Sequence, residues 1–170
     1  MVGQWAEKFP DTVKMISNEG HDIGNHSYSH LRMGAINRDR VRQEISLCSD
    51  KLKEITGNKI DLFRAPYGDY NNDILGIAKS LGYYTIQWDV DSLDWKPGIS
   101  EDEIMSRIVT KVRHGSIILF HNDTPYTAKI LPEIISALKN NGYGFLPVSG
   151  MIFRENYFMD FDGKQKSKNS

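Results

Sequence analysis

The amino-acid sequence predicts an α/β fold with a parallel sheet, and two observations favour it. Short apolar runs alternate along the chain with amphipathic segments of helix length, which is the pattern of repeated β/α units. Polar clusters follow four of the apolar runs, and in β/α barrels the side chains at the carboxyl ends of the strands build one shared site. The composition, 39% hydrophobic and 25% charged, is that of an ordinary globular protein.

Helices and strands are expected in alternation. Helices are predicted over residues 10–18, 37–56 and 72–81, where apolar residues recur at helical spacing. Two further helices carry apolar residues inward at the same spacing, namely Ile104, Ile108 and Val112 in one and Ile130, Ile134 and Leu138 in the other. Strands are predicted in the short apolar runs between them, over residues 22–25, 60–63, 84–88, 116–120 and 143–148.

Capping residues set the ends of these helices. Asn37 is expected to cap the longest helix, and Gly57 to end it, because glycine readily adopts the left-handed conformation. Ser100 and Glu103 have the spacing of a capping box and predict the start of the fourth helix. The fifth helix is expected to begin close to Pro132, because proline is tolerated only in a first turn.

The chain is expected to hold one domain over residues 1–152 and a C-terminal extension over residues 153–170, whose polar end from Gly163 is expected to be disordered. Cys48 is the single cysteine, which excludes an internal disulfide, and its helical neighbours favour core packing over a reactive thiol. No apolar run approaches the roughly 20 residues that cross a bilayer, and no export signal is recognisable. The formal net charge of -1 gives no electrostatic reason to bind nucleic acid.

The first polar cluster, HSYSH, places His26 and His30 at i and i+4. A helical turn would bring both imidazoles to one face, where they could bind one metal ion, but this spacing also arises by chance. The other clusters are RAPYG at residues 64–68, DVDSLDW at residues 89–95 and HN at residues 121–122. Four clusters that all follow predicted strands favour a shared site over four solvated loops.

These clusters resemble the motifs of the NodB-homology polysaccharide deacetylases, carbohydrate esterase family 4. The segment GHDIGNHSYSH at residues 20–30 looks like the zinc-binding motif of that family, and RAPYG looks like its third motif. DSLDW at residues 91–95 resembles the fourth motif, and LFH at residues 119–121 the fifth. The motifs occur in family order, and the resemblance runs from residue 1 to about residue 152. The resemblance implies a deformed (β/α) barrel that removes acetyl groups from N-acetylglucosamine units of a polysaccharide, with peptidoglycan favoured by similarity to sporulation-type members.

The resemblance also implies the residues of the chemistry. His26 and His30 would be ligands of zinc or a similar divalent ion. His121 would be the general acid that protonates the leaving amine of the sugar. Asp94, with Asp91, would keep that imidazole in its charged form, since a nearby carboxylate favours it.

Further residues would bind or orient the reacting groups. Arg64 would orient the catalytic carboxylate through bidentate contacts, and the backbone N–H of Tyr67 would stabilise the oxyanion. Trp95 and Leu119 would line the pocket for the sugar or the acetyl group. The N-acetylated polysaccharide is the expected partner, and members of the family usually work outside the membrane.

One family motif has no counterpart in the 170 residues. It is a strand that ends in Thr-Phe-Asp-Asp-Gly and supplies the catalytic base and a third protein ligand to the metal. The expected barrel therefore lacks its first β/α unit, and its exposed edge favours self-association. Two interpretations stay open, namely a deacetylase, or an impaired fragment or pseudoenzyme that retains a carbohydrate-binding groove. Asp89 is the first candidate for a substitute base.

Overall fold

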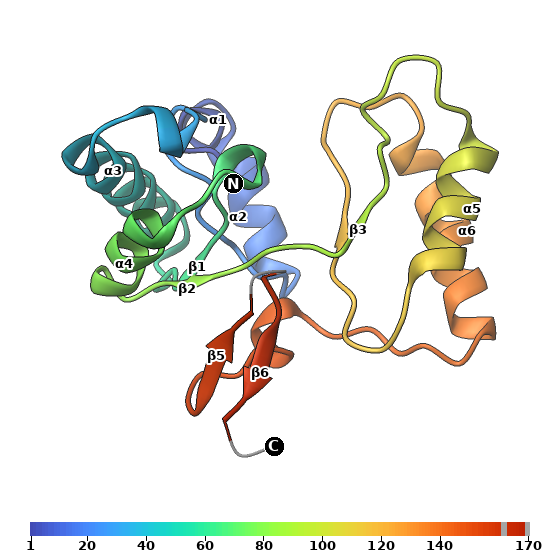
Figure 1. Cartoon of the computed structure of the whole chain (residues 1–170). Helices are drawn as coiled ribbons and strands as arrows, with labels where there is room; N and C mark the ends of the chain where they lie inside the picture. The colour runs from blue at the N-terminus through green and yellow to red at the C-terminus, as the bar shows by residue number, and fades with distance from the viewer. Residues whose placement is uncertain (161–162, 169–170) are drawn as a thin grey trace. The chain divides into compact units, whose positions relative to one another are not determined.

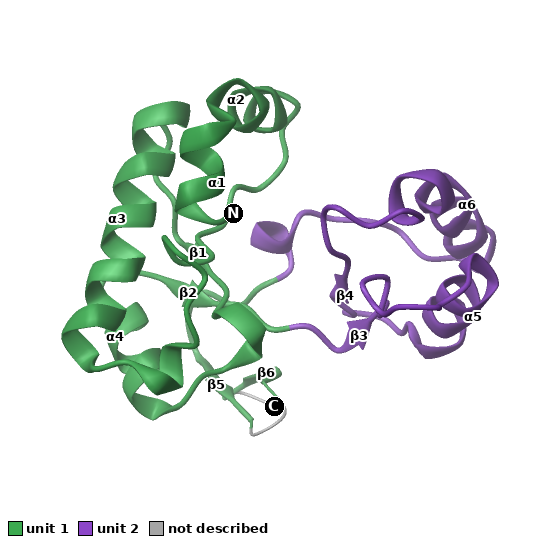
Figure 2. Cartoon of the chain, turned by 90° about the horizontal axis from the view of Figure 1, so that it is seen from above, with its two compact units in different colours: residues 1–87, 152–170 green, residues 88–151 purple. Residues whose placement is uncertain are grey.

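The computed structural model of the chain describes residues 1–160 and 163–168 (Figure 1). It contains two compact units, of which unit 1 comprises residues 1–87 and 152–170 and unit 2 residues 88–151 (Figure 2). Each unit has its own cluster of buried apolar side chains. The expectation of one domain over residues 1–152 stays a prediction. Within the described ranges no helix has the length and apolar character that crossing a membrane would need.

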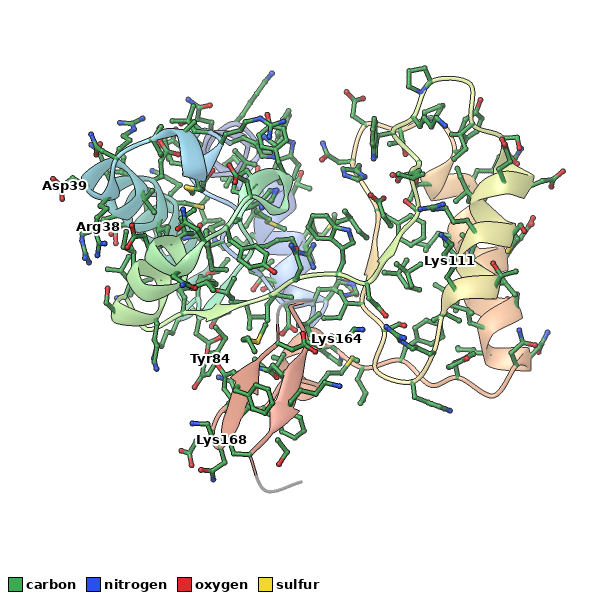
Figure 3. The ribbon with its side chains drawn as sticks, in the orientation of Figure 1. Arg38, Asp39, Tyr84, Lys111, Lys164 and Lys168 are labelled. Carbon is green, nitrogen blue, oxygen red and sulfur yellow. The ribbon has the colours of Figure 1, made fainter. Side chains whose placement is uncertain are left out.

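Helices dominate unit 1 (Figure 1). Its α-helices are α1 (Gly3–Lys8), α2 (Pro10–Asn18), α3 (Arg38–Thr56) and α4 (Asn72–Ser80). Helix α3 packs against the other three helices through a buried face that includes Ile45, Cys48 and Leu52. Figure 3 shows Arg38 and Asp39 pointing outward at the start of α3. The expected core position of Cys48 is confirmed.

The caps predicted for α2 and α3 are confirmed. Pro10 occupies the first turn of α2. The Asn37 side chain accepts a hydrogen bond from the Arg40 N–H at the start of α3, and Gly57 ends that helix with a φ of +72°. A short 3₁₀ turn, Met33–Ala35, follows the first polar cluster, and a second one, Pro66–Gly68, forms the end of the second cluster.

The parallel sheet of unit 1 is short. Strand β1 (Leu62–Phe63) pairs with β2 (Tyr84–Thr85), and Phe63 lies opposite Thr85. The predicted strand over residues 22–25 is reduced to a parallel bridge between Asn25 and Phe63. Because parallel neighbours end at the same edge, this bridge brings the residues after Asn25 beside those after Phe63. The sheet therefore places the first two polar clusters next to each other.

An antiparallel hairpin closes the described part of unit 1. Strand β5 (Tyr157–Met159) pairs with β6 (Gln165–Ser167). Just before the hairpin, the Arg154 guanidinium donates to Asp61 at 2.7 Å and stacks on Tyr84, which is labelled in Figure 3. Residues Gln165–Ser167 of the expected disordered end pair with β5, and the expectation for this end stays a prediction. Residues 169–170 lie outside the described residues.

Unit 2 contains β3 (Val90–Asp91), α5 (Glu101–Lys111), β4 (Ile118–Leu119) and α6 (Thr127–Asn140). Strands β3 and β4 are parallel, with Asp91 opposite Leu119. The capping box predicted at the start of α5 is present in both directions between Ser100 and Glu103. Helices α5 and α6 pack against each other over a buried apolar cluster (Figure 2).

Two expectations for unit 2 are wrong. Helix α6 begins at Thr127, so Pro132 lies in its second turn and removes one backbone hydrogen bond, to the carbonyl of Ala128. The predicted strand over residues 143–148 is not formed, and a 3₁₀ turn begins at Val148. Within the described residues this segment has no partner strand, and the Leu146 side chain is 67% exposed.

Candidate functional site

The residues singled out from the sequence fall into two groups, one in each unit. His26, His30, Arg64 and Tyr67 belong to unit 1, and Asp91, Asp94, Trp95, Leu119 and His121 belong to unit 2. Each group is brought together within its own unit. The convergence of both groups on one cleft stays a prediction. We call His26 and His30 the histidine pair, and Asp94 and His121 the Asp–His pair.

The histidine pair lies on an irregular loop and not on a helical turn, the arrangement that would have brought both rings to one face. Ser27 and His30 both have left-handed backbone angles, with φ values of +63° and +58°. Such values are uncommon for residues other than glycine and need support from the surrounding structure. The loop nevertheless brings the two rings together, with centroids 5.0 Å apart and planes at 68°. Proximity was thus predicted correctly but for the wrong geometric reason.

Buried side chains hold this loop. The amide of Asn25 donates to the carbonyl of Ile45 on α3 and accepts from the Ser27 N–H at 3.0 Å. The Ser27 hydroxyl oxygen then accepts from the His30 N–H at 2.9 Å. Both Asn25 and Ser27 are fully buried, so these bonds are shielded from water. The left-handed turn at His30 is therefore fixed from inside the unit.

Glu44 on α3 anchors the same loop. Its carboxylate accepts from the N–H and the hydroxyl of Ser29, each at 2.7 Å, and from the Arg40 guanidinium at 2.7 Å. The Glu44 side chain is fully buried, and the three donors compensate for the loss of water. Sequence reasoning missed Glu44, although a lone acidic residue on the apolar face of α3, beside Val41 and Ile45, was an available signal.

His26 is oriented as a neutral ligand. Its Nδ1–H donates to the carbonyl of Arg64 at 2.7 Å, which leaves the lone pair of Nε2 available. Burial lowers the pKa of His26 to about 4, so the ring is neutral at pH 7. The ring of His30 lies beside it, so the two imidazoles could supply two of the ligands of a divalent metal ion. Across the described residues, no cluster of three or more His, Cys, Asp or Glu side chains fits a metal ion.

Tyr67 borders the histidine pair. Its ring lies 4.8 Å from the ring of His30, and the Arg32 guanidinium stacks on the Tyr67 ring at 4.4 Å from the ring centroid. Tyr67 itself has a left-handed φ of +61° and a side chain that is 55% exposed. Burial lowers the pKa of the neighbouring Arg64. Cationic and aromatic groups therefore surround one side of the pair.

The Asp–His pair is the best-defined contact of unit 2. The Nδ1–H of His121 donates to one oxygen of Asp94 at 2.8 Å, and the His121 backbone N–H donates to the other at 2.9 Å. Asp94 is buried, with 2% of its surface exposed. Burial alone would raise the pKa of Asp94, but the hydrogen bonds from His121 and Thr127 outweigh it and lower the pKa. His121 is thereby fixed with its Nε2 directed away from Asp94.

The other predicted residues of unit 2 surround this pair. The ring of Trp95 lies 6.3 Å from that of His121 and is 55% exposed, so it can present an aromatic surface. Leu119 pairs with Asp91 across the two strands. The Asp91 carboxylate accepts from the Leu93 N–H at 2.9 Å and thereby stabilises the turn before Asp94.

Asp89 is engaged in a structural network. Its two oxygens accept from the Ile117 N–H at 2.9 Å and from the Ser116 hydroxyl at 3.0 Å, and Arg113 lies 3.4 Å away. These contacts tie the start of β3 to the strand that follows α5. The geometry disfavours Asp89 as a substitute base. Sequence reasoning also missed Thr127, whose hydroxyl donates a hydrogen bond to the Asp94 carboxylate at 2.6 Å.

Comparison with known proteins identifies related chains. A sequence model of the family described as polysaccharide deacetylase matches residues 1–86. A peptidoglycan-N-acetylglucosamine deacetylase of Bacillus cereus is 37% identical over 157 residues, which cover 89% of this chain and 56% of the relative. A second Bacillus cereus protein of the same name is 34% identical, with 89% of this chain and 73% of the relative covered. The chain spans between 47% and 62% of the length of four curated relatives.

Solved structures give the same result for the fold. The structure of a CE4 family pseudoenzyme from Bacillus anthracis matches with a TM-score of 0.84 at 29% identity, covering 88% of this chain and 53% of that one. A mutant of that protein is described as having restored enzymatic activity. The similarity to this structure confirms the predicted fold class, an α/β fold of the deformed (β/α) barrel type.

Proposed function

The chain belongs to the polysaccharide deacetylase family, and on that premise we propose that it removes acetyl groups from the N-acetylglucosamine units of peptidoglycan. The observation that carries the proposal is the Asp–His pair, in which the buried Asp94 fixes the imidazole at Nδ1, with the ring of the exposed Trp95 centred 6.3 Å from that imidazole. The names of the Bacillus cereus relatives support this choice of substrate.

The family generally depends on a metal ion, and we propose zinc, held by the histidine pair. A divalent ion bound there would polarise the acetamide carbonyl and lower the pKa of a water molecule. The Nδ1–H bond from His26 to the Arg64 carbonyl keeps the ligating nitrogen free of a proton. The backbone N–H of Tyr67 would stabilise negative charge on the carbonyl oxygen, and Arg64 would orient the catalytic carboxylate.

The leaving group requires a proton, and His121 is placed to supply one. Asp94 binds Nδ1 of His121, so the other ring nitrogen is the one that can transfer a proton to the sugar amine. Trp95 and Leu119 would line the pocket for the sugar and the acetyl group. Asp91, whose carboxylate stabilises the turn before Asp94, would assist Asp94 in keeping the imidazole charged.

Substituting His121→Gln tests this assignment. Acetate release from N-acetylglucosamine oligomers is expected to fall about 10²-fold, because the amine then leaves without a positioned general acid. His114, which packs on Tyr143 in the same unit, gives the matched control, since His114→Gln leaves the Asp–His pair intact. Equal rates for the two variants would remove His121 from the reaction.

Zinc is expected to bind weakly to the 170-residue chain, because two imidazoles and water make an incomplete site. Isothermal titration calorimetry on the wild type, His26→Ala and His21→Ala checks this. His21 is exposed in the same unit, so its loss is expected to change nothing, whereas His26→Ala is expected to abolish binding. Tight binding that survives His26→Ala would show that the ligands lie elsewhere.

A second candidate function follows from the match to a CE4 family pseudoenzyme. In that case the chain retains a carbohydrate-binding groove and catalyses poorly. Tryptophan fluorescence tests this: oligosaccharide binding at the exposed Trp95 is expected to quench or shift the emission of the wild type, and Trp95→Phe, which retains the chain's other tryptophans, is expected to lose that change. Binding of N-acetylglucosamine oligomers without release of acetate would favour the second candidate over the first.

A further inference from the structure

Thr127 makes a hydrogen bond that the chemistry above does not use. It is the first residue of α6, and its hydroxyl lies 2.6 Å from an oxygen of Asp94. That oxygen also accepts from the backbone N–H of His121, while the other oxygen accepts from the His121 ring. Thr127, on α6, therefore gives the buried carboxylate a third hydrogen bond in addition to the two from His121.

The direction of this hydrogen bond is fixed by chemistry. A carboxylate can only accept, so the single hydroxyl proton of Thr127 points to Asp94. The Thr127 oxygen is then left as an acceptor, and the hydroxyl of Thr124 donates to it at 2.7 Å. A chain of two hydroxyl groups thus ends on the carboxylate, and each bond in such a chain polarises the next.

The position of Thr127 also matters. The N-terminus of α6, a helix of 14 residues, carries partial positive charge, and the Asp94 carboxylate lies against its first residue. A buried carboxylate that lost a donor would move toward its neutral form. A neutral Asp94 would bind the His121 ring less strongly and could hold it in another tautomer.

We propose that Thr127 is a positioning residue, which keeps Asp94 ionised and oriented so that His121 presents its reactive nitrogen. The role in catalysis rests on the function proposed above, whereas the effect on Asp94 does not. Among the described residues, His121 is the ionisable group in contact with Asp94, so an altered Asp94 has one neighbour on which to act.

Three variants of the full chain test the proposal. Thr127→Val keeps the branched shape and removes the hydroxyl, Thr127→Ser keeps the hydroxyl, and Thr124→Val removes only the donor to Thr127. Carbon-13 NMR titration of the Asp94 carboxyl is expected to show a raised pKa in Thr127→Val, a smaller rise in Thr124→Val and none in Thr127→Ser. The downfield proton signal of His121 Nδ1–H is expected to weaken in the same order.

Thr110→Val is the matched control, because the Thr110 hydroxyl bonds to the Ser106 carbonyl within α5. It is expected to leave Asp94 and His121 unchanged. An Asp94 that titrates alike in the wild type and Thr127→Val would overturn the proposal, as would a Thr127→Ser variant that behaves like Thr127→Val. If Thr127→Val does not fold, Thr124→Val and Thr127→Ser decide by the same signals.

Acetate release separates the effect of Thr127 on Asp94 from its role in catalysis. In Thr127→Val, kcat is expected to fall about 10-fold with KM unchanged, because substrate binding does not involve this hydroxyl. A shifted Asp94 with no acetate release even from the wild type would contradict the proposed function and support the hydrogen-bond role. Normal kcat with a shifted Asp94 would contradict the positioning role in catalysis.

Discussion

The 170-residue chain is expected to release acetate from N-acetylglucosamine oligomers about 10²- to 10⁴-fold more slowly than the same chain extended at its N-terminus by a strand ending in Thr-Phe-Asp-Asp-Gly. The two aspartates of that strand would add a base for the metal-bound water and a third protein ligand beside the histidine pair. The strand itself would pair with a sheet edge, so the extended chain is also expected to associate less. Acetate release and light scattering on both proteins measure the two effects.

A control extension separates chemistry from packing. A strand ending in Thr-Phe-Ala-Ala-Gly retains the backbone and apolar residues but carries no carboxylate. It is expected to lower light scattering as much as the first extension does, while acetate release stays slow. A monomeric 170-residue chain that works as fast as the extended one would show that another residue serves as base. Asp89 is a disfavoured candidate, because both of its carboxylate oxygens already accept hydrogen bonds from Ser116 and Ile117.

Substituting Glu44→Ala is expected to lower the free energy of unfolding by about 1–3 kcal/mol, because partly buried donors lose a buried acceptor. The N–H and hydroxyl of Ser29 and the Arg40 guanidinium would all lose their acceptor. Ser29, the residue before the left-handed turn at His30, would no longer be held by α3. Urea unfolding followed by circular dichroism measures the loss of stability.

The same helix supplies the control for this experiment. Glu54 pairs with Lys51 at 2.7 Å on the surface of α3, and its side chain is 69% exposed. Since exposed ion pairs contribute about 0–1 kcal/mol, Glu54→Ala is expected to change the free energy of unfolding by less than about 1 kcal/mol. Comparable losses for both variants would mean that helix propensity, and not the buried acceptor, explains the result.

The helices were predictable wherever local chemistry decides their ends. Pro10, Asn37, Gly57 and the capping box at Ser100 act over a few residues, and each one marks the boundary found in the structure. The start of α6 was misjudged because the rule for proline considers only the local cost, namely the lost hydrogen bond and the clash of the ring with the preceding turn. Burial of the apolar face of α6 outweighs that loss.

The candidate site was predictable in composition but not in geometry. Residue types and order identified both pairs, and the parallel alignment of Asn25 with Phe63 explains why His26 reaches the Arg64 carbonyl. The left-handed turn of the histidine loop could not be predicted, because its supports include contacts of Asn25 and Ser29 with Ile45 and Glu44 on a helix that follows the loop. Contacts between distant segments therefore determine what spacing alone cannot.

The reactivity of Cys48 toward thiol reagents reports how often unit 1 opens. The side chain is fully buried in α3, with its sulfur 3.4 Å from the carbonyl of Met1, and burial raises the pKa of the thiol. A thiol reagent in the solvent can reach this sulfur only when α3 separates from the helices around it. Because the chain has one cysteine, every modified molecule records one such event, and the rate of modification measures how often the unit comes apart while the protein stays folded on average.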